Sequence, residues 1–149
     1  VLREHTHADF NTTDPIPSVS SVVDALEQEY SIESILTVRH PLDSYASLVK
    51  NGWVHFEPPS FDEYCRRLLL LVGQHDIKTI FKYEDFVSAP QANMEKICRA
   101  LSLPFSSSFE DIFSIFKVTG DSGRSADTIS SRDRIVPEHI IEESKKSIY

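Results

Sequence analysis

Two short apolar runs constrain the fold of this chain more than any other feature. The first, SILTV, covers residues 34–38, and the second, IKTIF, covers residues 77–81. Runs of this length, rich in β-branched side chains, are typical of strands buried in a parallel sheet. Apolar residues recur at helical spacing before, between and after the two runs. This alternation predicts an α/β fold with a parallel sheet, whose ligands bind at the carboxyl ends of the strands.

The expected helices surround these strands. The first begins at Ser18 or Ser20 and ends at Tyr30. Ser60 and Glu63 form a capping box at the start of another helix. The remaining segments, by residue number, are helices at 41–50, 61–74, 90–101, 109–116 and 137–147, a polar loop at 118–134, and the tail of a strand at 1–3.

The charge balance excludes one broad class of function. The chain of 149 residues carries 15 Lys and Arg against 23 Asp and Glu, a net charge of -8. A chain this acidic does not bind nucleic acid or other polyanions through its overall field. Any anion site must therefore be local.

The cysteines and the hydropathy pattern bear on the compartment. Cys65 and Cys98 show neither CxxC spacing nor a nearby histidine cluster, which favours free thiols over a disulfide or a metal site. No apolar run reaches the roughly 18 to 20 residues that a membrane-spanning helix needs. We therefore expect a cytoplasmic protein with no membrane span and no metal. Its first residues, VLREHTH, show neither an initiator Met nor a signal peptide, so we expect a fragment of a longer protein.

An arginine and two hydroxyls follow the first strand. Arg39 stands at the strand end, and Ser44 and Ser47 lie in the helix that Pro41 opens. A planar cation beside hydroxyls and a helix N-terminus suits a phosphate group. The alternative is that Arg39 pairs with Asp43 and that the serines only cap the helix.

Three further groups are candidates, each with a simpler alternative. His5 and His7 could accept a proton near neutral pH or be surface residues, and no third ligand supports a metal site there. Tyr83 could lie over a ligand, while the carboxylates after it could cap the next turn. The last group, Gly120, Ser122, Gly123 and Arg124, could form an anion-binding nest or a surface loop.

Taken in order, these segments resemble the sulfotransferases that use 3'-phosphoadenosine 5'-phosphosulfate (PAPS). RHPLDSYAS resembles the family's 3'-phosphate-binding segment, FKYEDFVSAP with MEKICRALSLPF its YED segment and following helix, LREHTH its strand-end base, and TGDSGRSADTISSR its late loop. The resemblance implies one partial sulfotransferase domain over residues 1–149. Its fold would be a three-layer, P-loop-like parallel sheet flanked by helices and incomplete at the N-terminus.

The resemblance also implies roles for particular residues. Arg39 and Ser47 would hold the 3'-phosphate, and Tyr83 would lie near the adenine. His5 would be the general base with Arg3 assisting, and His7 would replace His5 if the register differs. The late-loop residues Ser122, Gly123 and Arg124 would close over the nucleotide. PAPS would be the co-substrate, adenosine 3',5'-bisphosphate the product, and a small molecule or carbohydrate the acceptor.

One part of the family pattern has no match. Family members carry an N-terminal glycine loop that cradles the 5'-phosphosulfate, whereas the four glycines here are Gly52, Gly73, Gly120 and Gly123. We expect that the chain starts after this loop. The alternatives are a non-catalytic nucleotide-binding or interaction domain and, third, a P-loop kinase or GTPase relative, for which Asp85 is poorly placed as a magnesium ligand.

The acceptor has only weak candidates. Trp53, His55 and Phe56 lie in the loop between two expected helices and could line an acceptor pocket. Aromatic loop residues also pack on their own domain. The sequence does not predict the oligomeric state.

Overall fold

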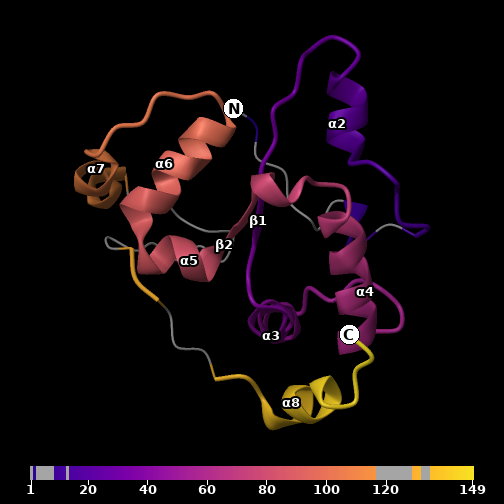
Figure 1. The fold of residues 1–149 in the computed structure, drawn as a ribbon. Coiled ribbons are helices and arrows are strands. Elements are labelled where there is room, and N and C mark those ends of the chain that lie inside the picture. The colour runs from indigo at the N-terminus through magenta and orange to yellow at the C-terminus, as the bar shows by residue number, and fades with distance from the viewer. Residues whose placement is uncertain (1, 3–8, 13, 117–128, 132–134) are drawn as a thin grey trace.

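The computed structural model describes residues 2, 9–12, 14–116, 129–131 and 135–149. In these ranges the chain is a mixed α/β structure with a small parallel sheet (Figure 1). The elements, in order, are α2 (Ser21–Leu26), β1 (Leu36–Val38), α3 (Pro41–Asn51), α4 (Phe61–Val72), the 3₁₀-helix η1 (Ile77–Thr79), β2 (Ile80–Lys82), α5 (Tyr83–Ser88), α6 (Pro90–Ala100), α7 (Phe109–Phe116) and α8 (Glu138–Ser144).

The sheet confirms the parallel pairing but not its expected size. Within the described residues it has two strands, β1 and β2, with Leu36 opposite Ile80, Thr37 opposite Phe81 and Val38 opposite Lys82. Figure 1 shows this pair between α4 on one side and α5 with α6 on the other. Of the strand expected at residues 1–3, only Leu2 is described, and its side chain is exposed.

The second strand begins three residues later than its apolar run predicts. Asp76 caps the 3₁₀-helix η1, because its carboxylate accepts the N–H of Lys78 at 2.8 Å. The hydroxyl of Thr79 donates to the Asp76 carbonyl at 2.8 Å. This local side-chain bonding competes with strand pairing. It leaves Ile77 exposed and starts the strand at Ile80.

The first helix is shorter than its apolar pattern predicts. Of the two predicted N-caps, Ser18 and Ser20, Ser20 caps α2: its side chain accepts the N–H of Val23 at 3.3 Å. The helix ends at Leu26 rather than at Tyr30, and none of its residues is buried. A helix that buries no face lacks the tertiary packing that extends short helices in proteins.

The core consists of two groups of buried side chains. The larger group joins α3, the loop after it, α4 and α8, and its members are Tyr45, Ala46, Leu48, Phe56, Phe61, Tyr64, Cys65 and Ile140. The smaller group, Phe10, Leu36 and Leu71, connects β1 to α4. Phe56 is buried in the larger group and Trp53 packs against it, so these two aromatics pack on their own domain.

A buried arginine ties α4 to the N-terminal segment. Arg67 is only 1% exposed. Its Nε donates to Glu63 Oε1 at 2.6 Å and its Nη1 donates to the Phe10 carbonyl at 2.8 Å. Arg66 also binds Glu63, through two bonds of 2.7 Å. Only one of the two bonds of the predicted capping box forms. Ser60 accepts the N–H of Glu63, but the Glu63 carboxylate pairs with Arg66 and Arg67.

Two further sequence expectations concern the cysteines and membrane-spanning helices. Cys65 and Cys98 are free thiols, the first buried and the second half-buried. None of the helices in the described ranges has the length and apolar character that crossing a bilayer requires.

Replacing Arg67 by Ala is expected to lower the free energy of unfolding by about 3 kcal/mol, because the Phe10 carbonyl loses its partner and a buried space opens. The matched control is Arg66→Ala. Its side chain is 44% exposed, so solvent screening should limit the loss to under about 1 kcal/mol. Urea unfolding measures the free energy of unfolding of both variants, and an equal decrease in the two would contradict the assigned role of Arg67.

Glu63 should make stability depend on acid pH. Hydrogen bonds from Arg66 lower the pKa of Glu63 below its usual 4.5, burial opposes them, and the bond from Arg67 with both positive charges adds to the lowering. The unfolded chain therefore binds this proton more readily. The stabilisation is complete above about pH 4.5 and is lost as the pH falls through the folded-state pKa.

The test is urea unfolding of wild type and Glu63→Gln between neutral pH and pH 3. The wild type should lose stability below about pH 4.5 more steeply than this variant does. Glu95→Gln, which changes an exposed carboxylate, is the control and should keep the wild-type slope. Parallel curves for wild type and Glu63→Gln would refute the prediction.

Candidate functional site

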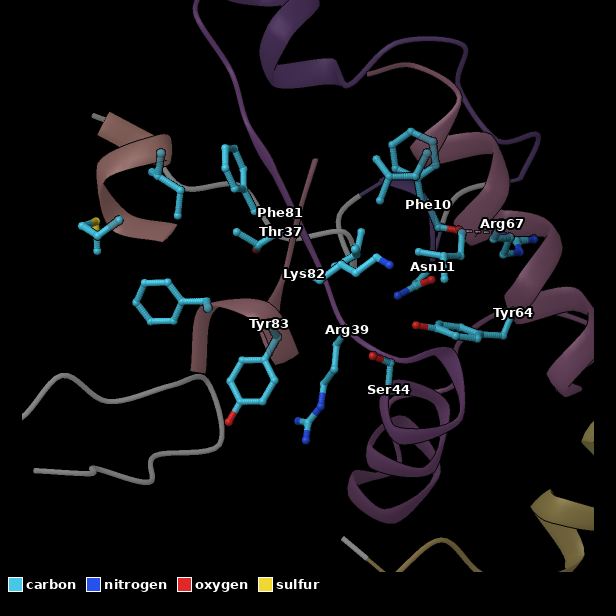
Figure 2. Close-up of a pocket in the computed structure, with 16 residues that line it drawn as sticks. Phe10, Asn11, Thr37, Arg39, Ser44, Tyr64, Arg67, Phe81, Lys82 and Tyr83 are labelled. Carbon is cyan, nitrogen blue, oxygen red and sulfur yellow. Dashed lines mark hydrogen bonds between the residues drawn. The ribbon is translucent and has the colours of Figure 1, made fainter. Parts of the chain in front are cut away.

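The register of the sheet brings two candidate residues together. Val38 pairs with Lys82, so the next residues, Arg39 and Tyr83, leave the two strands side by side. The guanidinium carbon of Arg39 lies 4.8 Å from the centre of the Tyr83 ring. This is within the range of a cation–π contact. Figure 2 shows both side chains at the strand ends.

Arg39 retains unused hydrogen-bonding capacity. Its side chain is 18% exposed, and its Nε is buried without a hydrogen-bond partner. Its Nη2 lies 3.8 Å from Asp43 Oδ2, which is too long for a hydrogen bond. The ion pair between Arg39 and Asp43, which the sequence analysis gave as the alternative, is therefore present but long. A buried guanidinium N–H without a partner is costly, and an anionic ligand would satisfy it.

These residues open onto a cavity of about 470 Å³. It is lined by Phe10, Asn11, Thr37, Val38, Arg39, Ser44, Tyr64, Arg67, Leu68, Leu71, Phe81, Lys82, Tyr83, Phe86, Met94 and Ile97. Among these described lining residues are three cations and no carboxylate. In a chain with a net charge of -8, the cavity is a local concentration of positive side chains, which is where the charge balance leaves room for an anion site.

The three cations are not equivalent. Arg67 is already bound to Glu63 and the Phe10 carbonyl, so its charge is largely compensated. Lys82 is the last paired residue of β2 and Arg39 is the first residue after β1, so both lie at the strand ends. The positive charge available to a ligand is therefore that of Lys82 and of Arg39, the latter partly offset by Asp43 and Glu84.

The α4 side of the cavity carries hydroxyls. Burial raises the pKa of Tyr64 to about 12, and a hydrogen bond with Ser44 opposes that rise. The Tyr64 phenol therefore stays protonated at neutral pH and can donate a hydrogen bond, but it cannot act as a base there. Buried Asn11 adds an amide on the same side (Figure 2).

Ser44, rather than Ser47, lines the cavity. Ser47 lies further along α3, and the side-chain amide of Asn51 donates to its carbonyl at 2.7 Å and approaches its hydroxyl at 3.4 Å. The structure thus brings Arg39 and Tyr83 together, with Ser44 nearby, but does not bring Ser47 into the cavity.

The remaining predicted site residues lie outside the described residues. These are Arg3, His5, His7, Ser122, Gly123 and Arg124. One described part of the polar loop does reach the site: the Tyr83 hydroxyl donates to the Ser130 carbonyl at 3.3 Å. The end of that loop therefore lies beside Tyr83.

Glu84 contacts the residue after Arg39. Its Oε1 accepts the N–H of His40 at 2.9 Å. Burial raises the pKa of Glu84, but the hydrogen bonds from the His40 N–H and its own N–H, with the nearby Arg39 charge, outweigh burial and lower it. The carboxylate is consequently ionised at neutral pH.

Sequence reasoning missed Lys82, Asn11 and Tyr64 as lining residues. Lys82 precedes Tyr83 directly, so ending the second strand one residue later would have placed it at the same edge. Asn11 and Tyr64 reach the cavity through tertiary packing, for which the sequence carries no local signal.

No cluster of three or more His, Cys, Asp or Glu side chains that could hold a metal occurs in the described ranges. Comparisons of this chain with protein-family models, with curated proteins and with solved structures find no match. The assignment of function therefore depends on the geometry of the strand-end cavity.

The contact between Arg39 and Tyr83 should be measurable by a double-mutant cycle of Arg39→Met and Tyr83→Leu. We expect a coupling energy of about 1 kcal/mol in urea unfolding, because exposed cation–π pairs contribute about 0.5–1 kcal/mol and the Arg39 side chain is mostly buried. Tyr83→Phe keeps the ring and loses only the bond to Ser130, so it is the control and should retain the coupling. A coupling energy near zero would contradict the stacking geometry.

Proposed function

We propose that the strand-end cavity is the nucleotide site of a PAPS-dependent sulfotransferase. The observation that carries this proposal is the buried Arg39 Nε without a partner, in a cavity with cations and aromatic rings and, among its described lining residues, no carboxylate. A nucleotide with a terminal phosphate offers an anion for the arginine and a base for the aromatic rings. The cavity volume of about 470 Å³ lies within the usual range for ligand pockets.

The proposed fold is a three-layer, P-loop-like parallel sheet flanked by helices. The parallel pair β1 and β2, each followed within two residues by a helix, supports it. Open parallel sheets of this kind bind ligands at the carboxyl ends of their strands, and the cavity lies at such an edge.

In the proposed reaction a sulfuryl group passes in line from PAPS to a hydroxyl or amine of the acceptor. The bond between sulfur and the bridging phosphate oxygen breaks, a bond between sulfur and the acceptor forms, and the acceptor proton goes to a base. This transfer needs positioning, charge neutralisation and a proton acceptor rather than a covalent intermediate. The products are the sulfated acceptor and adenosine 3',5'-bisphosphate.

The roles of the residues are proposed accordingly. Arg39 binds the 3'-phosphate, with Ser47 as the hydroxyl that the family resemblance implies and Ser44 as the one that lines the cavity. Tyr83 lies near the adenine. His5, or His7 in its place, accepts the acceptor proton with Arg3 assisting.

Two further parts of the proposal concern the late loop and the acceptor. Ser122, Gly123 and Arg124 cover the nucleotide, and the contact of Tyr83 with Ser130 supports a place for this loop nearby. The proposed acceptor is a small molecule or carbohydrate, and the proposed compartment is the cytoplasm, where Cys65 and Cys98 would stay reduced.

A second candidate is a nucleotide-binding domain without transfer activity. Gly52 and Gly73 each end a helix, at α3 and α4, so neither belongs to a strand-end phosphosulfate loop. Gly120 and Gly123 lie outside the described residues. A domain that keeps the 3'-phosphate site but lacks that loop would bind the bisphosphate without transferring a sulfuryl group.

Replacing Arg39 by Ala should weaken binding of adenosine 3',5'-bisphosphate by about ten- to hundredfold, because a charge-assisted hydrogen bond contributes about 1.5–3 kcal/mol. AMP, which lacks the 3'-phosphate, should bind wild type and variant alike. Calorimetric titration of the chain, and of the same protein extended upstream, measures the affinity for both ligands.

The control is Arg99→Ala, which removes an exposed arginine paired with Glu95 and should leave both affinities unchanged. If wild type fails to prefer the bisphosphate over AMP, the nucleotide site is refuted. If binding is confirmed but the extended protein transfers no sulfuryl group from PAPS, the non-catalytic candidate is favoured.

A further inference from the structure

Beyond the ends of β1 and β2, the next two pairs of residues also contact each other. After Val38 and Lys82, the next residues are Arg39 and Tyr83, and then His40 and Glu84. The first pair makes the cation–π contact of 4.8 Å. The second pair makes the 2.9 Å hydrogen bond from the His40 N–H to Glu84 Oε1. Two neighbouring residues of α5 therefore hold two neighbouring residues of the β1–α3 connection.

The second contact restrains the backbone of the arginine itself. The N–H of His40 belongs to the peptide group that joins Arg39 to His40, so its bond to Glu84 fixes the orientation of that peptide. On the other side of His40, Pro41 at the start of α3 favours the backbone close to polyproline II that His40 adopts, with φ -49 and ψ 126. His40 itself makes no side-chain cap for α3. The bond from Glu84 therefore restrains the peptide group that follows Arg39.

We propose that Glu84 is a positioning residue, which orients Arg39 toward the phosphate of the ligand through the peptide group between Arg39 and His40. Tyr83 complements it by supporting the guanidinium. This inference rests on the proposed function, because it assigns the orientation of Arg39 to the 3'-phosphate. Glu84 does not line the cavity and is not expected to touch the ligand.

The sign of the effect distinguishes positioning from simple electrostatics. Glu84 is negative and faces the positive Arg39 and the His40 ring, so its charge alone opposes the binding of an anion. If charge were its only effect, removing the carboxylate would strengthen binding. If it positions Arg39, removing the hydrogen-bond acceptor weakens binding, and a neutral acceptor of the same length restores it.

The experiment compares Glu84→Ala with Glu84→Gln by calorimetric titration against adenosine 3',5'-bisphosphate and AMP. Ala should weaken bisphosphate binding about tenfold, because Arg39 loses its orientation, and should leave AMP unchanged. Gln keeps an oxygen that can accept the His40 N–H, so it should stay within about threefold of wild type. Asp85→Ala removes a neighbouring carboxylate of the same turn and is the matched control, also expected within about threefold.

Folding is checked by circular dichroism and thermal unfolding of each variant. If Glu84→Ala does not fold, Glu84→Asp carries the test, since it keeps the charge but withdraws the carboxylate and should weaken bisphosphate binding as Ala would. Equal or tighter bisphosphate binding by Ala, or by Asp when Asp carries the test, would overturn the inference, and so would an equal loss for bisphosphate and AMP. A wild type that does not distinguish the two ligands would instead refute the proposed nucleotide site itself.

Discussion

The parallel register of β1 and β2 is the constraint on which the candidate site depends. It sets Val38 opposite Lys82, and both strands end at the same edge of the sheet, β2 leading directly into α5 and β1 into α3 after two residues. Because the ends coincide, residues more than forty positions apart in sequence meet as pairs, Arg39 with Tyr83 and His40 with Glu84. A slip of one residue in this pairing would move each side chain to the opposite face and separate both pairs.

Local sequence signals predicted the elements that form this edge. The β-branched run before Arg39 gave a strand, Pro41 opened a helix, and Ser60 capped the next one. These signals are reliable because each acts within a few residues of chain, through propensity, a fixed φ or a side-chain bond to a nearby N–H. They suffice to predict an α/β order and to place Arg39 and Tyr83 at strand ends.

What the sequence could not predict depends on contacts between distant segments. Glu63 carries a capping-box signal, yet its carboxylate pairs with Arg66 and with the buried Arg67, which also binds the Phe10 carbonyl. Asp76 redirects the chain into η1, although the apolar run there favours a strand. Tyr64 lines the cavity only because α4 packs beside α3. In each case tertiary packing or a competing hydrogen bond outweighs the local pattern.

The segregation of charge at the cavity has a consequence for how an anion would approach it. At physiological ionic strength, screening limits electrostatic forces between exposed charges to about 8 Å. A distant anion therefore senses little of the overall charge of -8, whether repulsive or not. Within that range it meets Arg39 and Lys82, and also Asp43, which lies 3.8 Å from Arg39, and Glu84, which is near the same guanidinium. The more distant acidic residues would neither guide nor block such a ligand, so its capture would depend on short-range encounters at the strand ends.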